Sequence, residues 1–324
     1  MVEIIIKKSN NLIKQIIMKK MIHYYIVLRR KIIRPILRNK KISYYLSKHF
    51  LKTYLALFYE NWTGKILNYK KPYDLNQKLM KLSWQNSVDP KMKILIPQCV
   101  DKFEVREYIK SKGYGETLNE LYGVYEDVND IDFDSLPEQF VMKITNASAR
   151  NFICIDKSKC NFEEIKKQFS EWIQDVDFGW QSGEWQYSLI KPRIVIEKYL
   201  KDLGSSSLID YKASVYNGKV EDFLVCYNRD SELTKDCYDI DWNRTNYIKD
   251  KWHTNRKDIP KPTQLDQMIR MAEECSKDFK YCRFDMYEID GKIIFGEMTF
   301  TPNGNVLSSF TDDYLHNMKD KICV

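Results

Sequence analysis

Residues 283–302 read Arg-Phe-Asp-Met-Tyr-Glu-Ile-Asp-Gly-Lys-Ile-Ile-Phe-Gly-Glu-Met-Thr-Phe-Thr-Pro. This stretch predicts two strands joined around an Asp-Gly pair. Side chains alternate along a strand, so Arg283 and Asp285 share one face, and Glu297 shares a face with Thr299. Two carboxylates beside a cation can hold Mg²⁺ against nucleotide phosphates, because Mg²⁺ is usually bound by one or two carboxylates plus phosphate oxygens. The alternative is a surface strand pair with a bridge between an arginine and a carboxylate.

The connection between these two strands decides whether the carboxylates meet. A plain two-residue turn at Asp290 and Gly291 would place Asp285 and Glu297 on opposite faces of the hairpin. A three-residue loop would bring both carboxylates to the same face. We therefore expect an odd-length loop, or a bulge with the same effect.

The rest of the chain predicts an α+β fold. Apolar periodicity and capping residues indicate helices over residues 42–60, 101–112 and 263–279, and after Asn161. Alternating or β-branched runs indicate strands over residues 138–144, 193–200, 210–216, 283–288 and 292–299. We expect a basic helical N-terminal segment at residues 1–58. The second region, residues 59–324, would have a helical lead-in at 59–100 and a compact core from about residue 95 to 324.

The net charge of +7 is unevenly distributed. Residues 1–52 contain 14 Lys or Arg and one acid, a net +13, whereas residues 53–324 carry a net −6. The longest uncharged stretch of the basic segment, Met21–Leu28, is far shorter than the roughly 20 apolar residues of a membrane span. The segment is expected either to lie on an anionic membrane surface or to be a solvated basic helix packed on its own domain. Nucleic acid is the least favoured partner.

The cysteines and histidines argue against several kinds of site. The eight cysteines include no Cys-x-x-Cys pair, which favours structural thiols in a reducing cytosol. The four histidines are far apart in the sequence, which argues against a zinc site or a Ser-His-Asp triad. We therefore expect a cytoplasmic protein.

Six ordered stretches resemble the ATP-grasp superfamily, and within it the TupA-like ATP-grasp proteins of bacterial cell-surface polysaccharide gene clusters. The stretches are Asp101-Lys-Phe-Glu-Val-Arg-Glu-Tyr108, Phe133-Asp-Ser-Leu-Pro-Glu-Gln-Phe140, Glu184-Trp-Gln-Tyr187, Lys191-Pro-Arg-Ile194, Tyr238-Asp-Ile-Asp-Trp242 and Gly296-Glu-Met-Thr-Phe-Thr-Pro302. The resemblance runs from about Trp62 to Pro302 and implies an ATP-grasp fold whose nucleotide-binding core lies within residues 95–324. We expect the stretch at 184–187 to serve packing.

The resemblance also implies a role for individual residues. Those toward the nucleotide are Lys102, Lys143 and Lys212 at the phosphates, Ser148 in the phosphate loop, Glu197 at the adenine amino group, and Tyr199 and Leu200 in the hinge beside the adenine. Those toward the metal and the reaction are Asp285, Glu297 and Thr299 as Mg²⁺ ligands, Arg283 as the catalytic group that neutralises charge in the acyl-phosphate step, and Lys143 as a second catalytic residue. Weaker candidates for an acceptor site are Arg229, Trp242 and Arg244.

Two features depart from the superfamily pattern. Thr299 stands where many ATP-grasp enzymes have an asparagine metal ligand. Relatives have a Gly-rich phosphate loop where this chain has Ala147, Ser148, Ala149 and Arg150. Glycine lets backbone amides face phosphate at positive φ, whereas alanine is strained there. The loop therefore predicts slow turnover, an altered nucleotide pose or a degenerate enzyme, unless Arg150 supplies the missing charge.

The function implied by the resemblance is an ATP- and Mg²⁺-dependent ligase that joins a carboxylate to an amine through an acyl phosphate. Its substrates would be a glycan or sugar acid, such as a uronic acid, and an amino acid or other amine. Two rivals stay open. A glycosyltransferase using a nucleotide sugar would employ Asp239-Ile-Asp241 or Asp130-Ile-Asp132, and a non-catalytic nucleotide-binding module is favoured by the altered loop. The expected location is the cytoplasm, either free or peripheral on the inner face of the cytoplasmic membrane.

Overall fold

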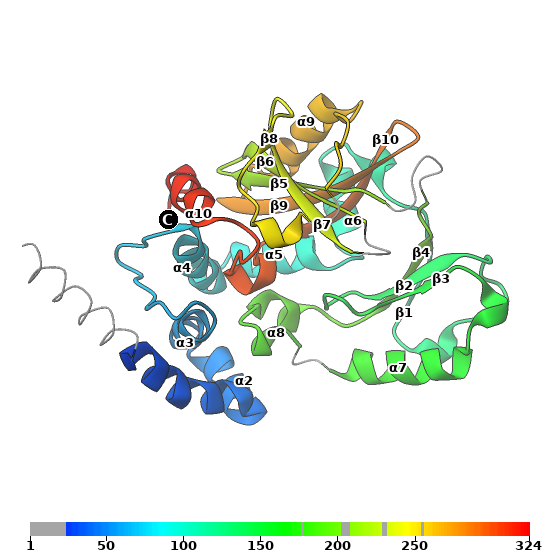
Figure 1. Ribbon diagram of the computed structural model, residues 1–324. Coiled ribbons are helices and arrows are strands. Elements are labelled where there is room, and N and C mark those ends of the chain that lie inside the picture. The colour runs from blue at the N-terminus through cyan, green and yellow to red at the C-terminus, as the bar shows by residue number, and fades with distance from the viewer. Residues whose placement is uncertain (1–23, 176–177, 202–207, 229–231, 254–255) are drawn as a thin grey trace, which may run out of the picture.

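The computed structural model describes residues 24–175, 178–201, 208–228, 232–253 and 256–324. Two antiparallel sheets form its framework (Figure 1). The smaller sheet has the strand order β1-β4-β2-β3. Its strands are β1 (Leu121–Tyr125), β2 (Phe140–Ile144), β3 (Asn151–Cys154) and β4 (Ile194–Lys198).

The larger sheet has six strands in the order β10-β9-β5-β6-β7-β8. Its strands are β5 (Asp210–Tyr216), β6 (Lys219–Tyr227), β7 (Thr234–Asp239), β8 (Arg244–Thr245), β9 (Tyr281–Ile289) and β10 (Lys292–Thr299). Helix α9 (Leu265–Ser276) contacts β5, β6 and β9 through a buried stripe that includes Met268 and Cys275. This 3.6-residue periodicity is what predicts the helix from the sequence.

A second amphipathic helix, α7 (Phe162–Gln174), covers the four-stranded sheet. Asn161 caps it as predicted, because its side-chain oxygen accepts from the backbone N–H of Glu164 at 3.3 Å. Phe169 is buried against the core of that sheet. The remaining helices that frame the two sheets are α4 (Leu75–Val88), α5 (Met92–Val100), α6 (Val105–Ser111), α8 (Phe178–Gln181) and α10 (Asp312–Met318).

The N-terminal region is helical, but not as one helix over residues 42–60. Residues 24–38 are helical, followed by α2 (Lys40–His49) and α3 (Leu51–Thr63). Phe50 breaks the predicted helix, because its backbone (φ −135°, ψ 48°) leaves the helical region. The predicted apolar stripe is also largely exposed, since Ile42, Tyr45 and Phe50 are each about half accessible to solvent.

The other expected elements are present, with ends that differ by a few residues. The predicted strand at 210–216 coincides with β5, and its turn has both Asn217 and Gly218 at positive φ. The helix predicted over 101–112 begins later, at Val105. The α+β fold class is therefore confirmed. The division of the chain at residues 58 and 59 stays a prediction.

Candidate active site

Two clusters of charged side chains lie on the two sheets. We call the first the lysine–glutamate cluster: Lys102, Arg106, Lys143 and Glu197. We call the second the carboxylate cluster: Asp210, Lys212, Arg283, Asp285, Glu297 and Thr299.

The lysine–glutamate cluster is centred on one carboxylate. Lys143 of β2 and Glu197 of the neighbouring β4 form an ion pair, with Nζ 2.7 Å from Oε2. Arg106 of α6 approaches the other oxygen of Glu197 at 3.3 Å and donates to the carbonyl of Asn119 at 2.8 Å. Two cations therefore share a single carboxylate, which leaves positive charge for an anionic ligand.

Lys102 adds a third cation to this cluster. Its Nζ donates to the carbonyl oxygen of Ala147 in the predicted phosphate loop. Asp101 fixes the local backbone, since one of its oxygens accepts from the N–H groups of Phe103 (2.7 Å) and Glu104 (3.1 Å). Burial lowers the pKa of Lys102 to about 8, although the charge of Glu297 opposes the shift.

The predicted phosphate loop is strained at one alanine and not at the other. Ala149 has φ +57°, in the left-handed region that glycine favours, whereas Ala147 is fully buried and has no positive φ. Arg150 donates to the carbonyl of Trp172 at 3.0 Å and pairs with Asp175. These contacts tie Arg150 to the end of α7, so the structure does not favour the expectation that Arg150 supplies charge for phosphate.

The hinge residues follow β4 directly. Tyr199 and Leu200 are half-buried at the point where the strand ends. They therefore lie two and three residues beyond Glu197, which is itself buried. Of the nucleotide residues implied by the resemblance, Lys212 lies elsewhere, in the carboxylate cluster.

The hairpin of β9 and β10 brings the carboxylates together by means of a bulge. Ile289 pairs with Lys292 across a two-residue turn, so the expected odd-length loop is wrong. The register shifts between Phe295 and Glu297, and Glu297 consequently pairs with Asp285. The expected alternative, a bulge with the same effect, is confirmed.

The extra residue in this bulge is Gly296. A Cβ atom at this position would lie 2.8 Å from the carbonyl oxygen of Asp285, closer than real Cβ contacts allow. The turn is a two-residue one because Asp290 (φ +50°) and Gly291 (φ +71°) both adopt positive φ, as such hairpin turns require. The hairpin therefore has a two-residue Asp-Gly turn and also both carboxylates on one face, because the bulge at Gly296 shifts the register between them.

Arg283 lies between the oxygen atoms of the carboxylate cluster. Its guanidinium makes two hydrogen bonds to Asp285, of 2.7 and 2.8 Å. The Arg283 Nη2 atom, which donates the 2.8 Å bond, also lies 2.9 Å from Glu297 Oε1 and 3.1 Å from Thr299 Oγ1. Lys212 of β5 pairs with Asp285 from the adjacent strand.

Burial and cations set the ionisation of this cluster. Burial raises the pKa of Asp285, against the opposing charges of Arg283 and Lys212. The Glu297 side chain is half exposed; desolvation by the surrounding protein opposes its ionisation, but the charges of Arg283, Lys212 and Lys102 together lower its pKa to about 2. Glu297 is therefore a carboxylate at neutral pH.

The donor set of the carboxylate cluster fits Mg²⁺. Asp285, Glu297 and Thr299 offer hard oxygen atoms on one face, and a cation, the Arg283 guanidinium, already lies between them. Within the described residues there is no group of three or more His, Cys, Asp or Glu that could hold a metal. A Mg²⁺ ion bound by Asp285, Glu297 and Thr299 would take its remaining ligands from phosphate oxygens or water.

Sequence reasoning missed two polar residues here. Arg106 follows Lys102 by four residues, a spacing that places two residues on one helical face, and this signal was available. Glu184 was expected only to pack, together with its neighbours. Trp185 and Tyr187 are indeed buried, but Glu184 accepts from Thr301 Oγ1 at 2.9 Å and lines a cavity. Burial raises the pKa of its carboxyl group.

This cavity has a volume of about 490 Å³ and adjoins the carboxylate cluster. Arg283, Glu297 and Thr299 line it, together with Ser148 of the predicted phosphate loop. Strand residues of the larger sheet and one loop residue of the smaller sheet therefore line a common space. The weaker acceptor candidates lie apart, since Trp242 stacks on Tyr238 with ring centroids 4.5 Å apart. Arg244 donates to the hydroxyl of Tyr238, and Arg229 lies outside the described residues.

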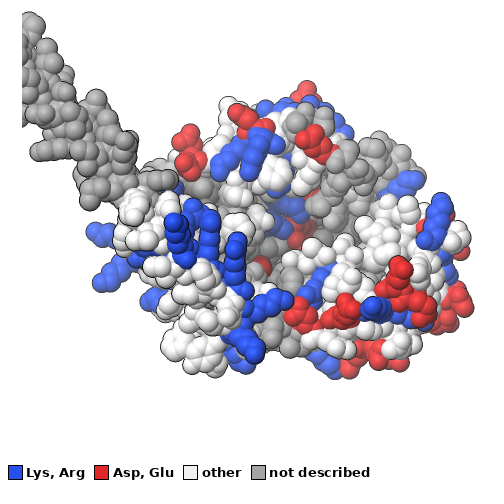
Figure 2. All heavy atoms as spheres, turned by 60° about the horizontal axis from the view of Figure 1, so that its bottom comes forward, with Lys and Arg blue, Asp and Glu red and all other residues white. Residues whose placement is uncertain are grey.

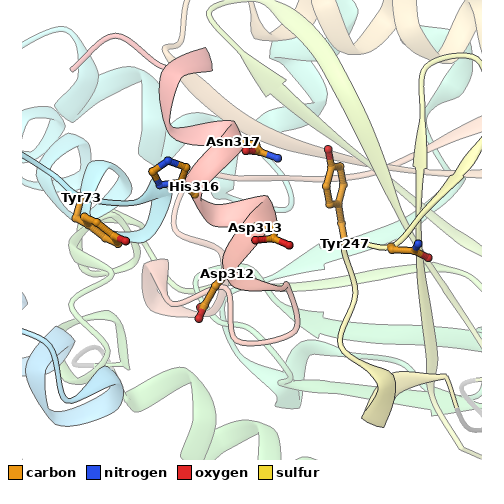
Figure 3. A pocket seen from close by; sticks show the side chains of 7 residues that line it. Tyr73, Tyr247, Asp312, Asp313, His316 and Asn317 are labelled. Carbon is orange, nitrogen blue, oxygen red and sulfur yellow. The ribbon is translucent and has the colours of Figure 1, made fainter. Parts of the chain in front are cut away.

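A larger pocket of about 590 Å³ lies against α10 (Figure 3). Asp312, Asp313 and His316 line it, with Tyr73 and Tyr247. Among the described residues that line this pocket, none belongs to either charged cluster. We therefore place the candidate active site in the smaller cavity, which Arg283, Glu297 and Thr299 of the carboxylate cluster line.

A lysine–glutamate pair on one sheet and paired carboxylates on a second sheet are the arrangement that the resemblance to ATP-grasp proteins implies. The chain belongs to the TupA-like ATP-grasp family, whose family model matches residues 78–322. The resemblance in the sequence is thereby confirmed. No curated protein sequence matches the chain.

Solved structures with a similar chain course include three ligases. D-alanine–D-alanine ligase from Bacillus anthracis is 18% identical, with a TM-score of 0.42, over 69% of this chain and 65% of that one. The enzyme of the same name from Helicobacter pylori is 15% identical, with a TM-score of 0.40, over 69% and 57%. L-amino acid ligase from Bacillus licheniformis is 11% identical, with a TM-score of 0.44, over 78% and 55%. The chain thus spans less than two thirds of each, and the family assignment rests on the family model.

Proposed function

We propose that the protein is an ATP- and Mg²⁺-dependent ligase that joins a carboxylate to an amine. The observation that carries the proposal is the pairing of Asp285 with Glu297 across the Gly296 bulge, with Arg283 between them. Arg283 and Glu297 line a cavity that Ser148 of the predicted phosphate loop also lines. Membership of the TupA-like ATP-grasp family supports the same chemistry.

The reaction would proceed in two transfers. A substrate carboxylate oxygen attacks the γ-phosphorus of ATP, the bond to the β-phosphate oxygen breaks, and ADP leaves. The amine then attacks the acyl carbon of the acyl phosphate. A C–N bond forms, the bond from carbon to the phosphate oxygen breaks, and inorganic phosphate leaves as the amine loses a proton.

The residues of the chain would mainly supply position and charge, which are what phosphoryl transfer requires of a protein. Lys102 and Lys143 would hold the ATP phosphates, with Glu197 directed toward the adenine amino group. Arg283 would neutralise the transferring phosphoryl group. Mg²⁺, when bound by the carboxylate cluster, would neutralise charge on the phosphate oxygens.

The remaining assignments follow from the resemblance. Tyr199 and Leu200 would border the adenine, Ser148 would contact phosphate, and Lys212 would act at the phosphates or hold Asp285 in place. The carboxylate substrate would be a glycan or sugar acid of cell-surface polysaccharide synthesis, and the second substrate an amino acid or other amine.

The test is ADP release from ATP over a panel of uronic acids and amino acids, with Mg²⁺ present. Release that requires one member of each class would support the ligase. ATP binding with no turnover over the panel would favour the non-catalytic module. Binding of a nucleotide sugar but not ATP would favour the glycosyltransferase. That rival is weakened by Asp239, whose carboxylate accepts from the backbone N–H groups of Asp241 and Asn243 and so caps a turn.

We also propose that the N-terminal helices rest on an anionic membrane surface. Lys and Arg gather over this part of the molecule (Figure 2). The helix at 24–38 buries Ile33, and Arg29 forms two hydrogen bonds to Glu60 of α3. Its other face exposes both apolar and basic side chains: Tyr24, Val27, Leu28, Lys31, Ile32, Arg34 and Arg38.

This mixture is typical of helices that lie in a membrane interface. No helix of the described residues is long and apolar enough to cross a membrane. The full chain should sediment with vesicles containing phosphatidylglycerol, and less so as salt screens the attraction. Ile32→Asp should weaken sedimentation. Val88→Asp, at an equally exposed position (62% against 61%), should not. Equal sedimentation of both variants would contradict the proposal.

A further inference from the structure

The cavity beside the carboxylate cluster extends well beyond the residues assigned to ATP and Mg²⁺. Arg283 and Glu297 line one part. Another part is lined by Trp62 of α3, Trp252 of the short helix η5 (Asp250–Trp252) and Lys235 of β7. A pocket with apolar walls and a few placed polar groups is the usual form of a small-molecule site.

A second cation lines the cavity from β7, which β5 and β6 separate from the β9 strand of Arg283. Lys235 Nζ lies 3.7 Å from the ring centroid of Trp252 and donates to Ser309 Oγ at 2.9 Å. These contacts hold the ammonium group in one place while it lines the cavity. An anionic or hydroxyl-bearing ligand would therefore meet two cations in the cavity lining, Lys235 and Arg283.

Aromatic side chains form much of the same wall. Trp62, Trp252 and Phe58 all line the cavity, and Trp62 is 63% exposed despite its size. An exposed indole face in a concave site offers a flat apolar surface to a ring, and its rigidity costs little conformational entropy. The wall therefore suits a ligand that combines a ring with charged or hydroxyl groups.

Helix α3 is built into this site, although it precedes the residues matched by the family model. A Cβ atom at Gly304, in the loop after β10, would lie only 3.1 Å from Phe58. Tyr54 of the same helix donates to the carbonyl of Gln181 at 2.6 Å. These close contacts hold α3 against the catalytic face, so Trp62 is a fixed part of the wall.

We propose that this cavity is the carboxylate-substrate site, and that Trp62 and Lys235 select an acidic sugar ring. The ring would lie against Trp62 and Trp252, with its reacting carboxylate toward Arg283 and its other polar groups toward Lys235. The proposal rests on the proposed ligase function, and it assigns part of the specificity to a helix outside the matched family region.

The experiment measures binding of D-glucuronate to the full chain in the presence of Mg²⁺ and a non-hydrolysable ATP analogue. Trp62→Ala and Lys235→Met should each weaken glucuronate binding by about tenfold or more, since each removes a direct contact. Analogue binding should change less than twofold. D-glucose, which lacks the carboxylate, should bind more weakly than glucuronate to the wild type.

Two variants serve as matched controls. Tyr73→Ala removes an equally exposed aromatic (64%) that lines the other pocket. Lys251→Met removes an exposed lysine, 5.4 Å from the same Trp252 ring, that is not part of the cavity wall. Both should bind glucuronate like the wild type. Trp62→Phe and Lys235→Arg should restore much of the binding if the losses are local.

The outcomes separate this proposal from the ligase function. Unchanged glucuronate binding in Trp62→Ala and Lys235→Met would overturn the substrate site, while ADP release by the wild type would still stand. Absence of saturable glucuronate binding to the wild type would overturn the choice of an acidic sugar. Glucuronate binding that depends on both residues, without ADP release over the panel, would support the site and count against the ligase.

Discussion

The two charged clusters differ in the balance of their charges. Among the described residues, the lysine–glutamate cluster has three cations and one carboxylate. The carboxylate cluster has three carboxylates and two cations, and Arg283 lies between Asp285 and Glu297. The first cluster is prepared for an anion and the second for a cation. On the proposed function, a nucleoside triphosphate carrying Mg²⁺ would present both, so that one ligand would use both clusters.

The largest expected effect concerns the carboxylate cluster, which we propose binds Mg²⁺. Glu297→Gln should lower ADP release by about 100- to 1,000-fold, because a bound metal contributes several kcal/mol of transition-state stabilisation. ATP binding should change little, since the lysines remain. The Glu297 side chain is half exposed, so the variant should fold. Glu163→Gln, whose side chain is 85% exposed on α7, is the control and should be active. A Glu297→Gln variant that kept more than half of the wild-type turnover would remove the carboxylate cluster from catalysis.

The next largest effect concerns the lysine–glutamate cluster, which we propose binds the ATP phosphates. Lys143→Ala should weaken ATP binding by about 10- to 100-fold, the range expected for one charged hydrogen bond of roughly 1.5–3 kcal/mol. Calorimetry measures this directly. Lys159→Ala, at a lysine whose side chain is 81% exposed, should bind like the wild type. Equal affinities in all three proteins would show that Lys143 makes no contact with ATP.

A pH dependence should distinguish Lys102 within the same cluster. Burial lowers its pKa to about 8, so it is mostly charged at pH 7 and loses its charge as the pH rises through 8. The charged form is the one that binds phosphate. ATP affinity should therefore fall by roughly tenfold between pH 7 and 9.5. Lys102→Arg should remove most of this fall, because arginine stays charged. A flat affinity in the wild type over this range would contradict the assignment of Lys102.

The smallest effect concerns the phosphate loop. Ala149→Gly should raise the free energy of unfolding by about 1 kcal/mol, because the left-handed region strains an alanine. Ala147→Gly should instead lower the free energy of unfolding by about 0.5–1 kcal/mol, because Ala147 is buried and does not have a positive φ. Urea denaturation of both variants gives the comparison. If Ala149→Gly also raises ATP turnover, strain in the loop limits the wild-type reaction.

The sheets and the hairpin were accessible from the sequence because alternation and turn signals act over a few residues. The strand at 210–216 and the shared face of Asp285 and Glu297 are of this kind. A two-residue Asp-Gly turn places the two carboxylates on opposite faces unless the hairpin contains a bulge. The sequence therefore predicted an odd-length loop or a bulge, but not the position of a bulge. In the structure the bulged residue is Gly296, where a Cβ atom would lie too close to the carbonyl oxygen of Asp285.

The cavity wall was not accessible in the same way. The contact from Tyr54 to Gln181 joins residues 127 positions apart, and no local pattern encodes such a pair. The break at Phe50 is a backbone change in a segment whose composition suits a helix throughout. Glu184 was missed because its stretch is rich in aromatic residues that do pack, and only the fold directs one polar side chain into a cavity.

The bulge at Gly296 imposes a parity rule on the length of the hairpin. Adding or removing one residue between Asp285 and Glu297 would turn Glu297 to the opposite face, whereas a change of two residues would leave it where it is. Among natural relatives, length variation in this hairpin should therefore come in even steps. Odd steps should appear only together with gain or loss of a bulge. The hairpin can therefore become longer or shorter while Asp285 and Glu297 stay on one face, provided that residues are added or removed in pairs.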